Sequence, residues 1–200
     1  MFIQVVRGTL ADEAGFRKII DRWNTEVKPG AIGYLGTTAG VLDGGGFVIC
    51  ARFESEELAM QNSGRPEQGA FFAEASQNFA GEPEFINVTD VEPWLDGGSD
   101  DAGFVQVMIG HSPDRAALRD AARSNSEGLR AARPEIIGGM QGFFGDDGFV
   151  NIGYFTSEAE ARTGEASDPP TDVAGNVDEF QRLMGEVEFL DIHEPILFSK

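Results

Sequence analysis

Cysteine and histidine are scarce in this sequence: its 200 residues include one cysteine, Cys50, and two histidines. A single cysteine excludes an internal disulfide framework, and its position within an apolar run is typical of a buried thiol in a reducing compartment. Two histidines among scattered acidic residues form no recognisable metal-ligand spacing. We therefore expect a cytoplasmic protein without a metal site.

Long hydrophobic runs and a secretory leader are also missing. No apolar stretch approaches the roughly 18 residues that span a bilayer. The N-terminal residues read as a strand, not as a basic leader followed by an apolar segment. These absences predict no membrane segment and argue against secretion.

Basic residues are few: 15 Lys and Arg stand against 34 Asp and Glu, which gives a formal charge of −19 at pH 7. Nucleic acids and anionic membrane surfaces are bound by clusters of Lys and Arg, so we expect neither as a partner. The acidic residues are scattered along the sequence, which favours a role in solubility. An acidic surface that recruits a basic partner is the alternative.

An internal repeat is the main positive feature. Residues 2–8 (FIQVVRG) match residues 104–110 (FVQVMIG) at an offset of 102, which is 104 minus 2. Later matches have an offset of 104, as if the second copy had gained two residues in a loop. We predict two repeats, 1–95 and 104–200, joined by a flexible linker at 96–103.

Each repeat has the pattern β-α-β-β-α-β. Residues 2–7 alternate as a strand, and apolar residues then recur at helical spacing from Phe16 to Val27. Ser55 and Ser157 are predicted to cap the second helical stretch of each repeat, and Ser112 to cap the first helix of the second repeat. This order of elements is the ferredoxin-like split unit.

Two such units resemble the dimeric α+β barrels, in particular domains of the antibiotic-biosynthesis-monooxygenase type. The resemblance covers nearly the whole chain and rests on the element order and on the strand-to-helix passages at 52–58 (RFESEEL) and 154–159 (YFTSEA). It implies an α+β fold in which two tandem ferredoxin-like units form one pseudo-symmetric barrel. Such a chain is expected to be a monomer, as an intramolecular pseudo-dimer, or a homodimer.

The two repeats differ at positions that are aligned without gaps. His193 and Asp191 stand where the first repeat has Thr89 and Asn87, and their spacing of two places both on one face of a strand. In the split unit this last strand neighbours the first strand, which carries Gln106. These three polar residues predict a site in the second repeat.

A second difference predicts a pocket near that site. Asn125 stands where the first repeat has Trp23, whose position on the apolar stripe indicates that it fills the space between helix and sheet. The smaller, polar Asn125 would leave room there. Asn151 and Tyr154 are further candidate substrate-binding residues, although they project to opposite faces of their strand.

Two functions are compatible with this pattern. The first is a monooxygenase-like enzyme that acts without a metal or cofactor on a small aromatic or polyketide-like substrate. His193, held by Asp191 or a neighbour, would be the general base, and Gln106 and Asn125 would orient the substrate. The second is a non-catalytic barrel that binds a small apolar or aromatic ligand, or whose cavity is filled by Phe143, Phe144 or Phe180. His193 would then be a strand-end histidine, hydrogen-bonded or solvated.

Haem degradation is disfavoured by the same resemblance. Haem-degrading relatives use an Asn on the first strand and a Trp and a His from the second helical region. This chain has no Trp or His between residues 50 and 90 or between 150 and 186, and its first strands carry Gln4 and Gln106 instead.

Overall fold

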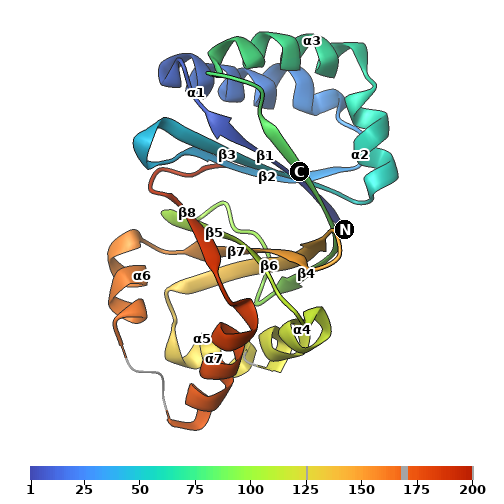
Figure 1. Ribbon diagram of the computed structural model, residues 1–200. Helices are drawn as coiled ribbons and strands as arrows, with labels where there is room; N and C mark the ends of the chain where they lie inside the picture. Colours follow the sequence, from blue (N-terminus) through green and yellow to red (C-terminus); the bar gives the residue numbers. More distant parts are fainter. Residues whose placement is uncertain (125, 168–170, 200) are drawn as a thin grey trace. The chain divides into compact units, whose positions relative to one another are not determined.

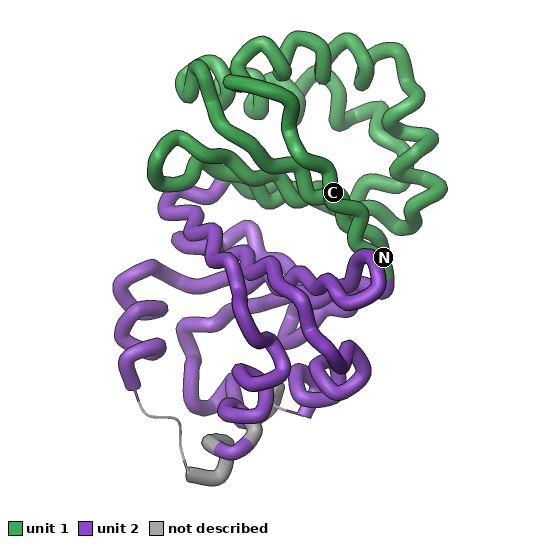
Figure 2. Tube along the Cα trace, viewed as in Figure 1, with its two compact units in different colours: residues 1–89, 196–200 green, residues 90–195 purple. Residues whose placement is uncertain are grey.

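The computed structural model describes residues 1–124, 126–167 and 171–199, which form two compact units. Unit 1 comprises Met1–Thr89 and Ile196–Lys200, and unit 2 comprises Asp90–Pro195 (Figure 2). In each unit, helices cover one face of an antiparallel sheet (Figure 1). The predicted fold class, α+β with two ferredoxin-like units, is confirmed.

Unit 1 follows the predicted element order, and its strands lie in the order β4-β1-β3-β2-β9. The helix α1 continues through a π-helical turn at Trp23–Val27 and ends in a short helical turn at Lys28–Gly30. The elements are β1 (Phe2–Thr9), α1 (Glu13–Arg22), β2 (Tyr34–Val41), β3 (Gly46–Phe53), α2 (Glu56–Ser63), α3 (Pro66–Ala75), β4 (Glu84–Trp94) and β9 (Ile196–Ser199).

Unit 2 repeats this order, with its strands arranged β8-β5-β7-β6 and the end of β4 beside β6. Its elements are β5 (Phe104–His111), α4 (Arg115–Ser124), α5 (Ser126–Ala132), β6 (Ile136–Phe144), β7 (Gly148–Phe155), α6 (Glu158–Glu165), α7 (Thr171–Met184) and β8 (Val187–Ile192). Contacts between α4 and α7 join the two longest helices of the unit.

Short polar side chains begin several helices. Ser55 and Ser157 each accept a hydrogen bond from the backbone N–H three residues further on (3.2 and 3.3 Å), so both predicted caps are confirmed. The predicted cap at Ser112 is wrong. The Asp114 carboxylate accepts the hydrogen bond from the Ala117 N–H (2.9 Å), because it lies three residues before that donor.

Each unit is completed by a segment from beyond its own repeat. The C-terminal strand β9 pairs antiparallel with residues 36–39 of β2 and belongs to unit 1. Conversely, Asp90–Trp94 belong to unit 2, where a Cβ at Gly139 would lie only 2.1 Å from the Trp94 indole. A glycine is therefore required for the indole to lie against β6. The predicted repeats, 1–95 and 104–200, are segments of similar sequence, whereas the compact units are groups of residues in contact. The repeat boundaries therefore stay a prediction.

Aromatic side chains fill the space between the sheet and the helices of unit 1. Phe16 and Phe47 are fully buried, and Phe47 stacks on Phe79 with ring centroids 4.5 Å apart. Trp23 packs against the same cluster, with its ring centroid 4.9 Å from that of Tyr34. The prediction that Trp23 fills this space is confirmed.

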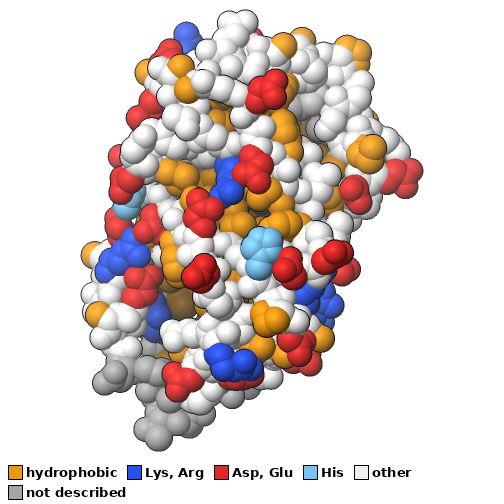
Figure 3. All heavy atoms as spheres, viewed as in Figure 1, with side chains coloured by type: hydrophobic (Ala, Val, Ile, Leu, Met, Phe, Trp, Pro, Cys, Tyr) orange, Lys and Arg blue, Asp and Glu red, His pale blue; other side chains and the backbone are white. Residues whose placement is uncertain are grey.

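On the face drawn in Figure 3, acidic side chains are spread among neutral and apolar ones and do not form one block. Among the described helices, none combines the length and the apolar character needed to cross a bilayer.

Cys50 on β3 is expected to resist alkylation. Its side chain is fully buried, and burial raises the pKa of the thiol to about 12. At pH 8 only on the order of one such thiol in 10,000 is the reactive thiolate. Ellman's reagent should therefore react at least about 100-fold more slowly with the native protein than with the denatured protein. A Met60→Cys variant, whose new thiol lies at an exposed position of the same unit, should react at once. Rapid labelling of native Cys50 would contradict the burial.

Removal of β9 is expected to destabilise unit 1. A chain that ends at Pro195 loses the strand that covers the β2 edge and three half-buried apolar side chains, Ile196, Leu197 and Phe198. The free energy of unfolding should fall by about 2–4 kcal/mol, which lowers the melting temperature by several degrees. Hydrogen exchange should accelerate at the amides of residues 36–39, and Ser199→Ala serves as the control. An unchanged melting temperature and unchanged protection would show that β9 adds nothing to the sheet.

Candidate functional site

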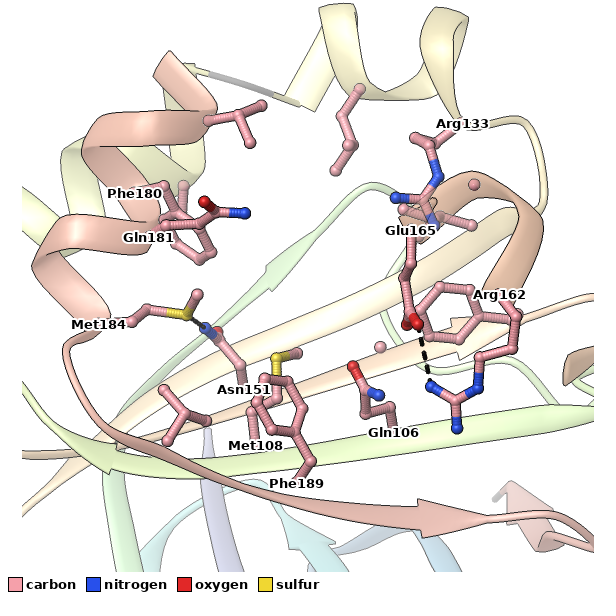
Figure 4. Close-up of a pocket in the computed structure, with 18 of the residues that line it drawn as sticks. Gln106, Met108, Arg133, Asn151, Arg162, Glu165, Phe180, Gln181, Met184 and Phe189 are labelled. Carbon is pink, nitrogen blue, oxygen red and sulfur yellow. Dashed lines mark hydrogen bonds and ion pairs between the residues drawn. The ribbon is translucent and has the colours of Figure 1, made fainter. Parts of the chain in front are cut away.

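Unit 2 contains a cavity of about 920 Å³ between its sheet and its helices (Figure 4). This is within the range of about 300–1,000 Å³ that is common for small-molecule sites. The wall is mostly apolar, and its larger apolar side chains include Met108, Leu129, Ile136, Phe155, Phe180 and Met184. Polar groups come from the strands (Gln106, Asn151, Asp191) and from the helical side (Arg133, Arg162, Glu165, Gln181).

A small residue of the second repeat lines this cavity. Ala122 of α4 stands at the position that Ile20 occupies in the first repeat (122 minus 102). Asn125, the predicted replacement for Trp23, lies outside the described residues.

The phenylalanines that would fill the space under the non-catalytic alternative lie elsewhere or on the wall. Phe143 is buried in a cluster with Leu118 and Phe149 and does not line the cavity. Phe144 lies beside His111, with ring centroids 5.9 Å apart. Phe180 lines the wall from α7 (Figure 4).

Two of the predicted residues meet on the cavity wall. Gln106 and Asp191 are directly opposite each other on β5 and β8, and Gln106 Nε2 donates to Asp191 Oδ1 over 2.9 Å. Their counterparts Gln4 and Asn87 make the same pair in unit 1, at 3.3 Å. The second repeat therefore keeps the pairing but replaces a neutral amide by a carboxylate.

An arginine that the sequence analysis missed neutralises this carboxylate. Arg162 of α6 donates to Asp191 Oδ2, to Glu165 (3.0 Å) and to Glu158 (3.3 Å). The hydrogen bond with Asp191, followed by that with Glu165, raises the pKa of Arg162 further above its ordinary value. Arg162 therefore remains charged and cannot pass protons. The first repeat has Met60 at the equivalent position (162 minus 102). A charged residue in place of an apolar one was therefore the feature of the sequence that could have identified Arg162.

His193 lies beside this network and is not among the residues that line the cavity. Its Nδ1 is 2.7 Å from Glu158 Oε2, and its ring centroid is 6.0 Å from that of the buried Phe104. The neighbour that holds His193 is thus Glu158, while both oxygens of Asp191 are bonded to Gln106 and Arg162. The role of His193 as a base stays a prediction.

The two candidates on β7 lie on opposite faces of the sheet, as their spacing predicts. Asn151 is 1% exposed and lines the cavity, whereas Tyr154 is fully buried and does not. Among the side chains that the structure describes, no group of three or more His, Cys, Asp or Glu is arranged to hold a metal ion.

Comparison with known proteins identifies the fold. No protein-family model and no curated protein matches the sequence. Among solved structures, a proposed monooxygenase from Fusobacterium nucleatum has a TM-score of 0.75 at 10% identity, over 100% of this chain and 94% of its own. One from Lactobacillus acidophilus has a TM-score of 0.71 at 12% identity, over 99% of both chains. An anthrone oxidase-like protein has a TM-score of 0.66 at 11% identity, over 99% of this chain and 92% of its own.

The chain has the fold of these monooxygenase-like proteins. The resemblance that the element order predicts is thereby confirmed at the level of the fold. Identities of 10–12% extend the likeness no further than that.

Filling the cavity should stabilise the protein. The variant Ala122→Ile restores the side chain that the first repeat has at this position. The free energy of unfolding should rise by as much as about 2 kcal/mol, because the added apolar surface is buried in the cavity. The control Ala116→Ile changes an exposed residue of the same helix and should not raise the melting temperature. If no space exists beside Ala122, overpacking should instead cost about 1–3 kcal/mol and lower the melting temperature.

Proposed function

We propose that this protein is a monooxygenase-like enzyme that acts on a small aromatic or polyketide-like substrate in the cavity of unit 2, without a metal or organic cofactor. The single observation that supports this most is the cavity itself, an apolar space with amide and carboxylate groups on the strand side. The counterparts of the lining residues Ala122, Leu129 and Asn151 in unit 1 are Ile20, Val27 and Ile49, which belong to or pack against its apolar core. The fold relatives described as monooxygenases and as anthrone oxidase-like agree with this class of reaction and substrate.

The proposed reaction uses dioxygen as its only other reactant. A base takes a proton from an acidic C–H of the substrate, and the carbanion reduces dioxygen while forming a C–O bond. Protonation gives a hydroperoxide, and loss of water leaves a carbonyl group. One oxygen atom enters the product and the other leaves as water, so that the substrate supplies every electron.

Two groups are candidates for the base. Asp191 lines the cavity, but both of its oxygens already accept hydrogen bonds. His193 lies two residues further along the chain, where its Nδ1 is held by Glu158, and its Nε2 would be the basic atom. Gln106, held by Asp191, would orient a substrate oxygen.

The second candidate function is non-catalytic binding of a small apolar or aromatic ligand. It is favoured by one observation, the position of His193 outside the cavity lining. We also infer a cytoplasmic location from the single buried cysteine, and a chain that acts as a monomer or homodimer without nucleic acid or membrane partners.

A ligand panel tests the proposal. The purified protein is heated with phenols, anthrones, quinones, fatty acids and haem, and the melting temperature is recorded. A ligand present at 100 times its dissociation constant should add about 2.7 kcal/mol of stability. Ligands that stabilise the protein are then tested for dioxygen consumption. We expect aromatic compounds to bind and at least one anthrone-type or phenolic compound to be oxidised.

Matched variants separate the two functions. His193→Ala should lower the turnover by about 10²–10⁴-fold and leave ligand stabilisation in place, since a general base contributes that much. His111→Ala is the control, because the other histidine of unit 2 is 67% exposed and bonded to Asp147 away from the cavity. Binding without dioxygen consumption would favour the non-catalytic function. Absence of any aromatic binding would overturn both.

A further inference from the structure

In the part of the chain that the structure describes, two buried side-chain amides on the sheet of unit 2 each have one polar atom without a hydrogen-bond partner. Asn151 is 1% exposed and Gln141 is 4% exposed. Among the described residues, neither Asn151 Oδ1 nor Gln141 Nε2 has a hydrogen-bond partner. Buried amide groups in native proteins nearly always have a partner, and leaving one without costs free energy. Asn151 lines the cavity whereas Gln141 does not, so at Asn151 such an exception points to a group that is supplied from outside the chain.

The two amides occupy facing positions on adjacent strands. Gln141 of β6 and Asn151 of β7 are direct partners in the antiparallel register, so their side chains project to the same face of the sheet. Asn151 lines the cavity, and Figure 4 shows its amide directed from the sheet toward Met184. Within the part of the chain that the structure describes, the Asn151 Nδ2 donates to the Met184 thioether, at 3.9 Å, and a thioether is a weak acceptor. Exchange of the amide oxygen and nitrogen of Asn151 would still leave one of them without a strong partner.

The fold itself does not need these amides. In unit 1 the equivalent positions are Ala39 and Ile49 (141 and 151, each minus 102), and they face each other across β2 and β3. Ile49 packs against the aromatic core there. The same strand pair thus forms with apolar residues in one unit and with two amides in the other.

The charges around the cavity indicate a neutral ligand. Its two arginines are paired with carboxylates: Arg162 with Asp191 and Glu165, and Arg133 with Glu135. An anion would have to compete with these carboxylates. A hydroxyl group, in contrast, can donate to an amide oxygen and accept from an amide N–H at the same time.

We propose that Asn151, which faces Gln141 across the strand pair, is the specificity-determining residue of the cavity and selects neutral aromatic ligands that carry a hydroxyl group. This inference rests on the proposed ligand-binding role of the unit 2 cavity, and it does not depend on catalysis. The hydroxyl donates to the Asn151 amide, and the aromatic body packs against the apolar wall formed by side chains such as Met108 and Phe180.

The test compares two ligands that differ only in the hydroxyl. Dissociation constants of β-naphthol and naphthalene are measured for the wild type and for Asn151→Ile, which copies the residue of unit 1. The wild type should prefer β-naphthol by roughly tenfold or more, because the analogue leaves the amide unpaired. Asn151→Ile should lose this preference and bind naphthalene at least as well as the wild type does.

Stability without ligand gives a second readout. Asn151→Ile should leave the melting temperature unchanged or raise it, because it removes an unsatisfied buried amide. The reciprocal control Ile49→Asn places such an amide in the filled core of unit 1. It should lower the melting temperature and leave the β-naphthol preference intact.

Three results would overturn the inference. Equal preference in the wild type and Asn151→Ile would show that the amide does not select the hydroxyl. A fall in melting temperature as large as that of Ile49→Asn would assign Asn151 a structural role. Binding of neither ligand by the wild type would overturn the inference together with the ligand-binding role of the cavity. A protein that prefers β-naphthol but consumes no dioxygen would refute only the proposed catalysis.

Discussion

In both units a layer of helices packs on one face of a sheet, and the side chains between the layers either fill that space or leave a cavity. Protein interiors are normally close-packed, so the size of each side chain at this interface has direct consequences. Phe16, Phe47 and Trp23 fill it in unit 1. In unit 2, Ala122 replaces an isoleucine of the first helix, and a cavity of about 920 Å³ lies beside it. The presence of two units with the same element order allows this divergence, since unit 1 retains a filled core.

The sheet register determines which polar groups reach the cavity. Gln106, Asn151 and Asp191 come from three adjacent strands, and the pairing of β5 with β7 and β8 places them on one face. Arg162 then binds Asp191 from the helix side, so the carboxylate is compensated by a charge on a different element. The result is an apolar cavity with amides on its sheet side and with arginines that are paired with carboxylates. Such a cavity suits a neutral ligand better than an anion.

The sequence alone predicts much of this. Element order and the internal repeat follow from periodicity and from matched segments. The packing of Trp23 in the core of unit 1 was predicted correctly, whereas its counterpart Asn125 lies outside the described residues. The Gln106–Asp191 pair follows from strand adjacency. The partners of His193 and Asp191 could not be predicted, because they depend on where α6 places Glu158 and Arg162 relative to β8. The pairing of Gln141 with Asn151 depends on the register of β6 with β7. A hairpin pattern in the sequence determines that register only to within about a residue or two.

The most direct test of a ligand cavity confined to unit 2 is methyl NMR of the methionines during titration with β-naphthol. The chain has five: Met108 and Met184 line the cavity, Met140 lies on β6 outside the lining, and Met1 and Met60 are exposed in unit 1. An aromatic ring in the cavity should shift the methyl signals of Met108 and Met184 and leave those of Met1 and Met60 in place. Shifts at Met1 or Met60 without shifts at Met108 and Met184 would contradict this account.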